Sequence, residues 1–331
     1  MDIKNYLMKA ENKYSFSWAL EQIYLLLFCV LIGYHFFLTT MFSIEWPSLI
    51  QSYLNSAIVL VLVLKTGVDE KYNIKEILIV AVLGAAFLIA WRHNENEEIL
   101  LCMLVIWGAR KINFEKILKV FFAVLAVLLI FTVVCSLTGH VENLIFYQGD
   151  RRARMAFGVC YPTDFSAYIF FLSVVYCYLR KEKLRYLETI GVAALGILVY
   201  YFCDARMNTI CLLLTAILFS YLIFMRRRQK KKGKEYEMHK ALAYLLALSP
   251  TICAAVMILL SMFYSSQNRI LSMLNSMLNN RIYYSHKGME LYGIPLWGQY
   301  VPMRGNGGTT EVIRNYFFLD SSYISILLQF G

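Results

Sequence analysis

Apolar residues fill long stretches of this chain, and polar residues gather in short segments between them. Runs of roughly 20 apolar residues recur along the whole length, which is the length of helix that crosses a bilayer core. The pattern predicts membrane helices over residues 17–38, 48–64, 75–91, 97–109, 117–138, 164–179, 186–203, 207–225 and 241–264, with another beginning near residue 319. We therefore expect an all-α, polytopic integral membrane protein with about 10 transmembrane helices, forming a single membrane domain over residues 1–331.

The last predicted helix has about 13 of the roughly 20 residues that a span needs. From this we expect the sequence to be truncated within a longer chain. The first apolar run follows a polar segment that lacks a small-residue cleavage site, so we expect no cleavable signal peptide.

Composition supports the membrane class. Hydrophobic residues make up 59% of the chain and charged residues 16%, and a soluble fold could not bury so much apolar surface. The eight cysteines lie mostly inside apolar runs and form no CxxC or Cys/His cluster, which favours small core residues over metal ligands or disulfides. The pI of about 9.1 does not indicate nucleic-acid binding, because the basic residues fall at helix ends.

The basic residues predict the orientation of the spans. If the N-terminus is cytoplasmic, the inside segments 1–16, 65–76, 110–119, 180–185 and 226–240 hold 22 of the 32 Lys and Arg residues. This excess is the positive-inside pattern, and it places the opposite loops outside the cell membrane.

Arginine dominates the basic residues outside. Nine of the ten are arginines, whereas inside lysine leads by sixteen to six. Because a guanidinium group grips phosphate oxygens through a planar, bidentate fork, the bias indicates an anionic, phosphorylated ligand at the outer face. Ordinary ion pairs with Asp150, Asp164, Asp204 and Glu290 are the alternative for any one arginine.

A long outside loop covers residues 265–318. Its first part has apolar residues at helical spacing, which predicts an amphipathic helix that lies in the membrane interface and roofs a cavity; these residues are Ile270, Met273, Leu274, Met277 and Leu278. Gly305, Gly307 and Gly308 allow a tight backbone path near a ligand, without a Walker-type phosphate loop.

Individual polar residues of this half leave two interpretations open. Asp320 either caps the helix that follows, with Ser321 and Ser322, or acts at the membrane boundary by ordering an arginine or accepting a proton. His286 is either a general base or a solvated loop residue. The four tyrosines of the loop either stack on sugar rings or form an interfacial aromatic belt; they are Tyr283, Tyr284, Tyr292 and Tyr300.

Four segments of the chain resemble one family of membrane enzymes. They are RMAFGVCYPTDFSAY at 154–168, DARMN at 204–208, PLWGQYVPMRGNGG at 295–308 and YFFLDSSYISILL at 316–328. The combination is similar to the Wzy-type polymerases of bacterial capsule and exopolysaccharide assembly, in the O-antigen polymerase and ligase superfamily. The resemblance covers these motifs in the second half and the hydropathy layout of the whole chain.

The resemblance implies a function at the outer face of the bacterial cytoplasmic membrane, with the N-terminus in the cytoplasm. The substrate would be an oligosaccharide repeat on undecaprenyl pyrophosphate, joined into a long polymer without a cofactor. Membrane lipid, a chain-length regulator and the flippase of the same pathway are the other expected partners. The family's arginines match Arg154, Arg206 and, at the opening of the loop motif, Arg281, while its DSSY match places Asp320 and Tyr323 in the same site.

The chemistry requires placement and charge more than special side chains. Guanidinium groups aimed at the bridging oxygen of a glycosyl pyrophosphate favour the transition state without a metal, consistent with the lack of a DxD-type carboxylate pair in the outside loops. We expect Asp320 or His286 as the base, and further substrate contacts from a second set of residues: Arg151, Arg152, Asp164, Asp204, Tyr323 and Arg304.

Three other functions compete with a polymerase. A polysaccharide ligase would use the same donor and arginines with another acceptor. A lipid-linked saccharide flippase or transporter should show internal repeats and mid-membrane charges, neither of which is clear in this sequence. A scaffold without catalysis would not account for the arginine bias.

Overall fold

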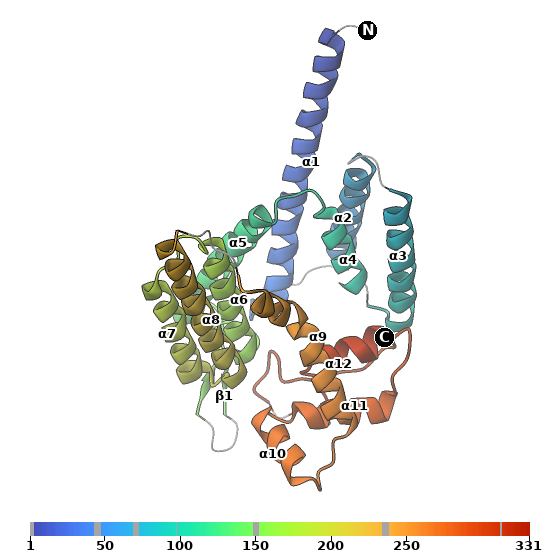
Figure 1. Ribbon diagram of the computed structural model, residues 1–331. Helices are drawn as coiled ribbons and strands as arrows, with labels where there is room; N and C mark the ends of the chain where they lie inside the picture. The colour runs from blue at the N-terminus through green and yellow to red at the C-terminus, as the bar shows by residue number, and fades with distance from the viewer. Residues whose placement is uncertain are drawn as a thin grey trace. The chain divides into compact units, whose positions relative to one another are not determined.

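The computed structural model describes residues 3–42, 48–68, 73–96, 98–147, 152–233, 238–311 and 313–331. Within these ranges helices dominate and the one two-stranded sheet is a short hairpin (Figure 1). The helices are α1 (Ile3–Leu38), α2 (Ser48–Val68), α3 (Ile74–Asn94), α4 (Glu98–Gly108), α5 (Phe114–Leu137), α6 (Pro162–Leu179), α7 (Tyr186–Cys203), α8 (Arg206–Lys231), α9 (Lys240–Met262), α10 (Arg269–Met277), α11 (Arg281–Tyr292) and α12 (Ser322–Phe330), and the strands are β1 (Ile145–Phe146) and β2 (Arg154–Met155).

Seven helices in the described ranges are long and apolar enough to cross a membrane. They comprise Trp18–Leu38 of α1 and the whole of α3, α5, α6, α7, α8 and α9. Two shorter apolar stretches, Asn55–Lys65 in α2 and Glu98–Gly108, occupy other predicted spans. The prediction of an all-α, polytopic membrane protein is confirmed.

Helix ends differ from the prediction where polar residues continue a helix. α1 begins at Ile3 instead of residue 17, and α8 runs to Lys231 instead of residue 225. The α8 extension consists of Arg, Gln and Lys, which are strong helix formers, and half of the α1 extension is Lys, Leu, Met, Ala or Glu, so the backbone stays helical beyond the apolar pattern. α12 begins three residues later than predicted because Ser321 takes the N-cap position.

The chain forms two compact units. Unit 1 comprises residues 1–87, 97–144 and 155–179, and unit 2 comprises residues 88–96, 145–154 and 180–331. In unit 1, helix α1 packs against α2 and α5, α5 packs against α6, and α2 packs against α4. Polar side chains in this unit join neighbouring helices: the Thr39 hydroxyl lies 2.6 Å from the Tyr168 hydroxyl, and Lys65 Nζ donates to the Arg110 carbonyl at 2.8 Å.

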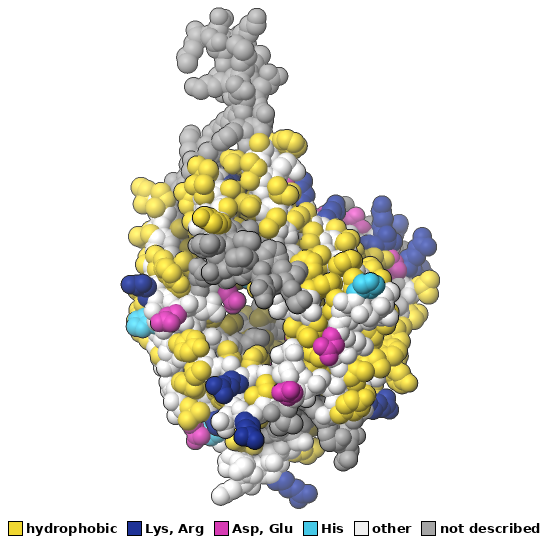
Figure 2. All heavy atoms as spheres, turned by 180° about the vertical axis from the view of Figure 1, so that it is seen from behind, with side chains coloured by type: hydrophobic (Ala, Val, Ile, Leu, Met, Phe, Trp, Pro, Cys, Tyr) yellow, Lys and Arg dark blue, Asp and Glu magenta, His cyan; other side chains and the backbone are white. Residues whose placement is uncertain are grey.

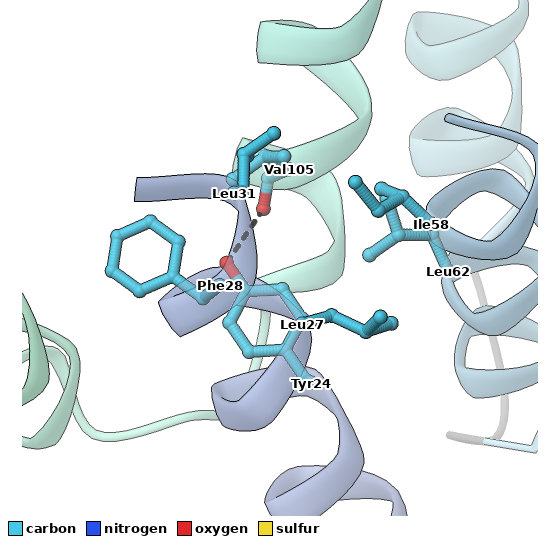
Figure 3. Close-up of a pocket in the computed structure, with 7 residues that line it drawn as sticks. All are labelled: Tyr24, Leu27, Phe28, Leu31, Ile58, Leu62 and Val105. Atoms are coloured by element: carbon cyan, nitrogen blue, oxygen red, sulfur yellow. Dashed lines mark hydrogen bonds between the residues drawn. The ribbon is translucent and has the colours of Figure 1, made fainter. Parts of the chain in front are cut away.

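The α1–α2–α4 junction of unit 1 is apolar with one polar link. Tyr24 Oη donates to the Val105 carbonyl at 3.0 Å beside a small pocket that Ile58 and Leu62 also line (Figure 3). Gly108 permits the close approach of α4 and α2, because an added Cβ would lie 1.9 Å from a Leu62 methyl group. A separate cavity of about 410 Å³ lies among α1, α5 and α6 and has an almost wholly apolar lining: Leu31, Ile32, His35, Phe36, Phe121, Leu125, Tyr168 and Phe171.

Unit 2 contains a helical hairpin and a C-terminal group of helices. α7 packs along α8, with Gly196 against Leu212. α11 packs on α9 and α12, where Gly288 leaves room for the side chains of Leu319 and Leu328. A hydrophobic cluster of Val301, Leu319, Ile324 and Leu328 closes this group.

Large apolar side chains stay exposed along the spanning helices. Val127 on α5, Ile197 on α7, Ile217 on α8 and Leu245 on α9 are all 59% or more exposed. Figure 2 shows hydrophobic side chains over much of the face that it presents. A protein surrounded by water rarely exposes so much contiguous apolar surface, whereas lipid tails cover it without cost.

Candidate functional site

The hairpin that follows α5 carries the first arginine of the site. β1 pairs with β2, and Arg154 in β2 is only 3% exposed. Burying a guanidinium group is costly unless its donors are satisfied. Arg154 Nε donates to the carbonyl of Cys203 at 3.0 Å. A buried arginine held in this way has a fixed position.

The partner of Arg154 is the end of helix α7. Cys203 is the last residue of α7, and the final carbonyls of a helix have no acceptor role within it. The C-terminus of a helix also carries partial negative charge, which favours a cation there. The contact therefore gives the Cys203 carbonyl a donor and gives one N–H of the buried Arg154 guanidinium an acceptor.

The turn between α7 and α8 holds a second charged pair. Asp204 adopts a left-handed conformation with φ 44° and ψ 40°, a region that Asp and Asn tolerate better than most residues. Its carboxylate is buried, and its Oδ1 lies 3.6 Å from Nε of Arg206. Arg206, the first residue of α8, is 49% exposed, so this pair is loose compared with Arg154.

Asp320 lies among the arginines in unit 2. It keeps solvent access although protein atoms surround it. Burial raises the pKa of the Asp320 carboxyl above its ordinary value, and the nearby Arg281 and Arg154 guanidinium groups partly offset the rise. Arg154, Arg281 and Asp320, from three separate segments, thus form one electrostatic group, which we call the arginine cluster.

Helix α11 brings two side chains to the cluster. Arg281 is its first residue and lies within electrostatic range of Cys211 on α8 as well as of Asp320. Tyr284 follows one turn later. Burial raises the pKa of the Tyr284 phenol, and the neighbouring Tyr283 and Asp320 raise it further. Tyr284 therefore lies within electrostatic range of Asp320, on the same helix as Arg281.

The backbone around Asp320 is held by a pairing across the loop. The backbone of Arg304 pairs with that of Phe317, with N···O distances of 2.7 and 3.2 Å. Gly305 makes this pairing possible, because an added Cβ would lie 2.8 Å from the Phe318 ring. The N-cap of α12 is Ser321, so Asp320 precedes the cap and does not serve as it.

The remainder of the RMAFGV motif lies in unit 1 and makes its contacts there. Phe157 has φ 50°, an unusual conformation for a bulky residue, and its N–H donates to Asn143 Oδ1 at 2.8 Å. Gly158 has φ 81° and packs against Thr132, where an added Cβ would lie 2.9 Å from a methyl group. These two residues turn the chain directly after the strand that carries Arg154.

The other predicted contacts are spread over both units. Arg152 is exposed, with its guanidinium carbon 5.9 Å from the Tyr200 ring centre and 6.0 Å from that of Tyr201, on the last turn of α7. Asp164 belongs to the first turn of α6 in unit 1. Tyr323 is 36% exposed on α12. Arg151 lies outside the described residues.

His286 contacts the end of α9. Its Nδ1 lies 2.9 Å from the carbonyl of Ser261 on α9, and its Nε2 lies 3.3 Å from Glu290. At about 100° per residue, His286 and Tyr284 lie roughly 200° apart around α11. The structure therefore joins His286 to α9, and the choice between His286 and Asp320 as the base stays a prediction.

Two contributors carry little signal in the sequence. The Cys203 carbonyl belongs to the backbone, and only the predicted end of a helix at residue 203 pointed to a free acceptor there. Asn275 is a buried polar residue inside a predicted amphipathic helix, and it contacts Tyr264, Asn280 and Tyr283. In the sequence, the one hint was that Asn275 lies six residues before Arg281, where α11 begins.

Comparisons of the chain with models of known protein families, with curated proteins and with solved structures gave no match.

Proposed function

We propose that the protein is a glycosyltransferase-type polymerase that joins oligosaccharide repeats carried on undecaprenyl pyrophosphate. The observation that carries the proposal is the arginine cluster: Arg154 is buried and held at the end of α7, and it lies with Arg281 within electrostatic range of the Asp320 carboxyl group. Two preorganised guanidinium groups suit the two phosphates of a pyrophosphate. The resemblance of the surrounding motifs to Wzy-type polymerases supports the same assignment.

In the proposed reaction, Arg154 and Arg281 bind the pyrophosphate of the donor. The bond between the anomeric carbon and the pyrophosphate oxygen breaks, and negative charge gathers on that oxygen. Because Arg154 is already fixed by the Cys203 carbonyl, little reorganisation is needed when the charge develops. The lipid pyrophosphate leaves as an anion paired with the two arginines.

The acceptor is a sugar hydroxyl of a second lipid-linked repeat. Its oxygen forms the new bond to the anomeric carbon, and its proton passes to Asp320. A carboxylate whose pKa is raised by burial is a better proton acceptor than one in water. Tyr284, beside Asp320, supplies a ring and a hydroxyl that suit the sugar.

The lipid part of the substrate requires apolar surface. In unit 2, exposed apolar side chains of α7, α8 and α9, such as Ile197, Ile217 and Leu245, suit an isoprenoid chain. The positive-inside pattern of the loops supports an extracytoplasmic reaction at the bacterial cytoplasmic membrane, where lipid-linked repeats are presented.

The test is polymer formation by the purified protein in lipid nanodiscs. Lipid-linked repeat units extracted from the producing cells would be added and the products resolved by gel electrophoresis. We expect a ladder of regular spacing from the unaltered protein and none from the double variant Arg154→Lys with Arg281→Lys, which keeps the charge and loses the forks. Arg314→Lys, at an exposed position in the loop, is the matched control.

Two results would overturn the proposal. A normal ladder from the double variant would show that the arginine forks are not used. Transfer of a single preformed chain to a different acceptor, without a ladder, would indicate the ligase instead.

A further inference from the structure

Helix α10 presents its apolar side outward and a polar residue inward. Ile270, Met273 and Met277 are 71%, 66% and 60% exposed, whereas Asn275 is 6% exposed. At about 100° per residue the three apolar residues fall within one sector of about 60°, and Ser272 and Ser276 lie roughly 90–130° from the centre of that sector. This is the reverse of a helix that packs on a water-soluble core.

The position of α10 makes lipid its natural neighbour. Membrane helix α9 ends at Met262, and Tyr264, two residues later, accepts a hydrogen bond from Asn275 Nδ2 at 3.4 Å. Phe263 between them is 71% exposed, so apolar surface continues past the end of α9. A helix fixed at the end of a span lies at the depth of the lipid headgroups.

The inward side of α10 controls the start of α11. The first N–H groups of a helix need acceptors from outside it, and the N-cap residue Asn280 makes no side-chain cap. Asn275 Oδ1 replaces it by accepting the N–H of Tyr283 at 2.9 Å, while its Nδ2 donates to Asn280 Oδ1 at 2.9 Å. The residue that begins α11 is Arg281 of the arginine cluster.

The turn between the two helices needs this support. Asn279 and Asn280 have φ values of 53° and 64°, and consecutive left-handed residues cost free energy unless their surroundings hold them. Loss of the Asn275 contacts would release both the turn and the first turn of α11.

We propose that α10 binds the membrane interface through Ile270, Met273 and Met277, and that this binding holds Arg281 in place through the Asn275 cap. The lipid surface on which the protein sits is thus part of the structure of the site. The membrane contact stands on the geometry of α10, and its effect on pyrophosphate binding rests on the proposed function.

The first test locates the apolar face. The photoreactive residue p-benzoylphenylalanine is placed at Met277 or at Ser272 in the full chain in nanodiscs of phosphatidylethanolamine and phosphatidylglycerol. We expect lipid adducts by mass spectrometry from Met277 and at least about fivefold fewer from Ser272, which lies roughly 140° around the helix. A dimer crosslink at Met277, or equal lipid labelling at both positions, would overturn the membrane contact.

The second test measures the start of α11 without any ligand. In hydrogen exchange, Met277→Asp and Asn275→Ala should both speed exchange of the peptide that contains the Tyr283 amide by about tenfold. Asn275→Asp keeps the accepting oxygen and should restore most of the protection, and Ser272→Asp is the matched control on the polar side. If Met277→Asp left the exchange rate of this peptide unchanged, the membrane contact of α10 would not stabilise the start of α11.

The third test uses undecaprenyl pyrophosphate itself as the probe. We expect Asn275→Ala to weaken binding about fivefold to tenfold, and to have no further effect when combined with Arg281→Ala. Additive losses would show that Asn275 does not act through Arg281. If the unaltered protein failed to bind the probe while the first two tests succeeded, the proposed function would be wrong. The membrane contact of α10 and the Asn275 cap of α11 would still be supported.

Discussion

Units 1 and 2 use polar side chains in opposite ways. In unit 1 the polar groups pair off between helices, as Tyr24 does with Val105 and Thr39 with Tyr168. In unit 2, Arg154 and Arg281 instead gather around Asp320 with solvent access. Paired groups stabilise a fold, whereas convergent like charges destabilise it unless a ligand neutralises them. Under the proposed function, the converging charges of unit 2 are the part of the molecule that binds the anionic ligand.

The largest expected effect is at Asp320. If it accepts the acceptor proton, Asp320→Asn should lower turnover by about 10²–10⁴-fold. The activity of the unaltered protein should rise with pH through the raised pKa of Asp320, because the base must be ionised. The measurement is the pH profile of ladder formation, and a rate that falls over the same range would contradict the role.

Stability should depend on Asp320 in the opposite sense. Its pKa is higher in the folded protein than in the unfolded chain, so the folded state holds the proton more tightly. The stabilisation from this group is fully present below the unfolded pKa and is lost as the pH rises through the folded pKa. Thermal unfolding of Asp320→Asn should lack that part of the pH dependence.

The next largest effect is a difference in activity loss between Arg154→Ala and Arg206→Ala, the two arginines that contact the α7–α8 turn. Arg154→Ala should reduce polymer formation about 10²–10³-fold, since it removes a buried, fixed donor. Arg206→Ala should cost about 1 kcal/mol or less, roughly fivefold, because its pair with Asp204 is half exposed. Rates from matched amounts of folded protein test this ranking, and equal losses would place Arg206 in the cluster.

A change in unit 1 should affect stability without affecting the chemistry. Gly108→Ala pushes a methyl group against Leu62 and should destabilise the fold by about 1–3 kcal/mol. The rate per folded molecule should stay the same. The check is thermal unfolding in detergent together with a rate measured well below the unfolding transition. A loss of rate without a loss of stability would contradict the prediction, because it would give Gly108 a role in the reaction.

The smallest expected effect is at Tyr24. Tyr24→Phe removes the hydrogen bond to Val105 and keeps the ring, so it should cost about 0.5–1.5 kcal/mol of stability. Tyr244→Phe, at a position 68% exposed on α9, is the matched control and should cost nothing measurable. A loss in the control equal to that in Tyr24→Phe would remove the link between α1 and α4 as a stabilising contact.

Local patterns predicted the helices well and the cluster partly. The spans near 186–203 and 241–264 agree with α7 and α9 to within two residues, because apolar runs of this length are bounded by charges or turn residues. The bias towards arginine in the loops pointed to Arg154 and Arg281. The same reasoning offered His286 equally with Asp320 as the base, and the sequence could not show that His286 contacts α9 because that contact joins residues 25 positions apart.

The sequence by itself determined the membrane class, the spans and the residue types that distinguish the loops, because these follow from hydropathy and charge along the chain. The tertiary structure decided that Arg154 is buried against the Cys203 carbonyl, that Asp320 lies near Arg281, and that Asn275 caps α11. These contacts join residues through backbone acceptors and left-handed turns. They depend on how helix ends meet in space, which the order of side chains along the chain does not encode locally.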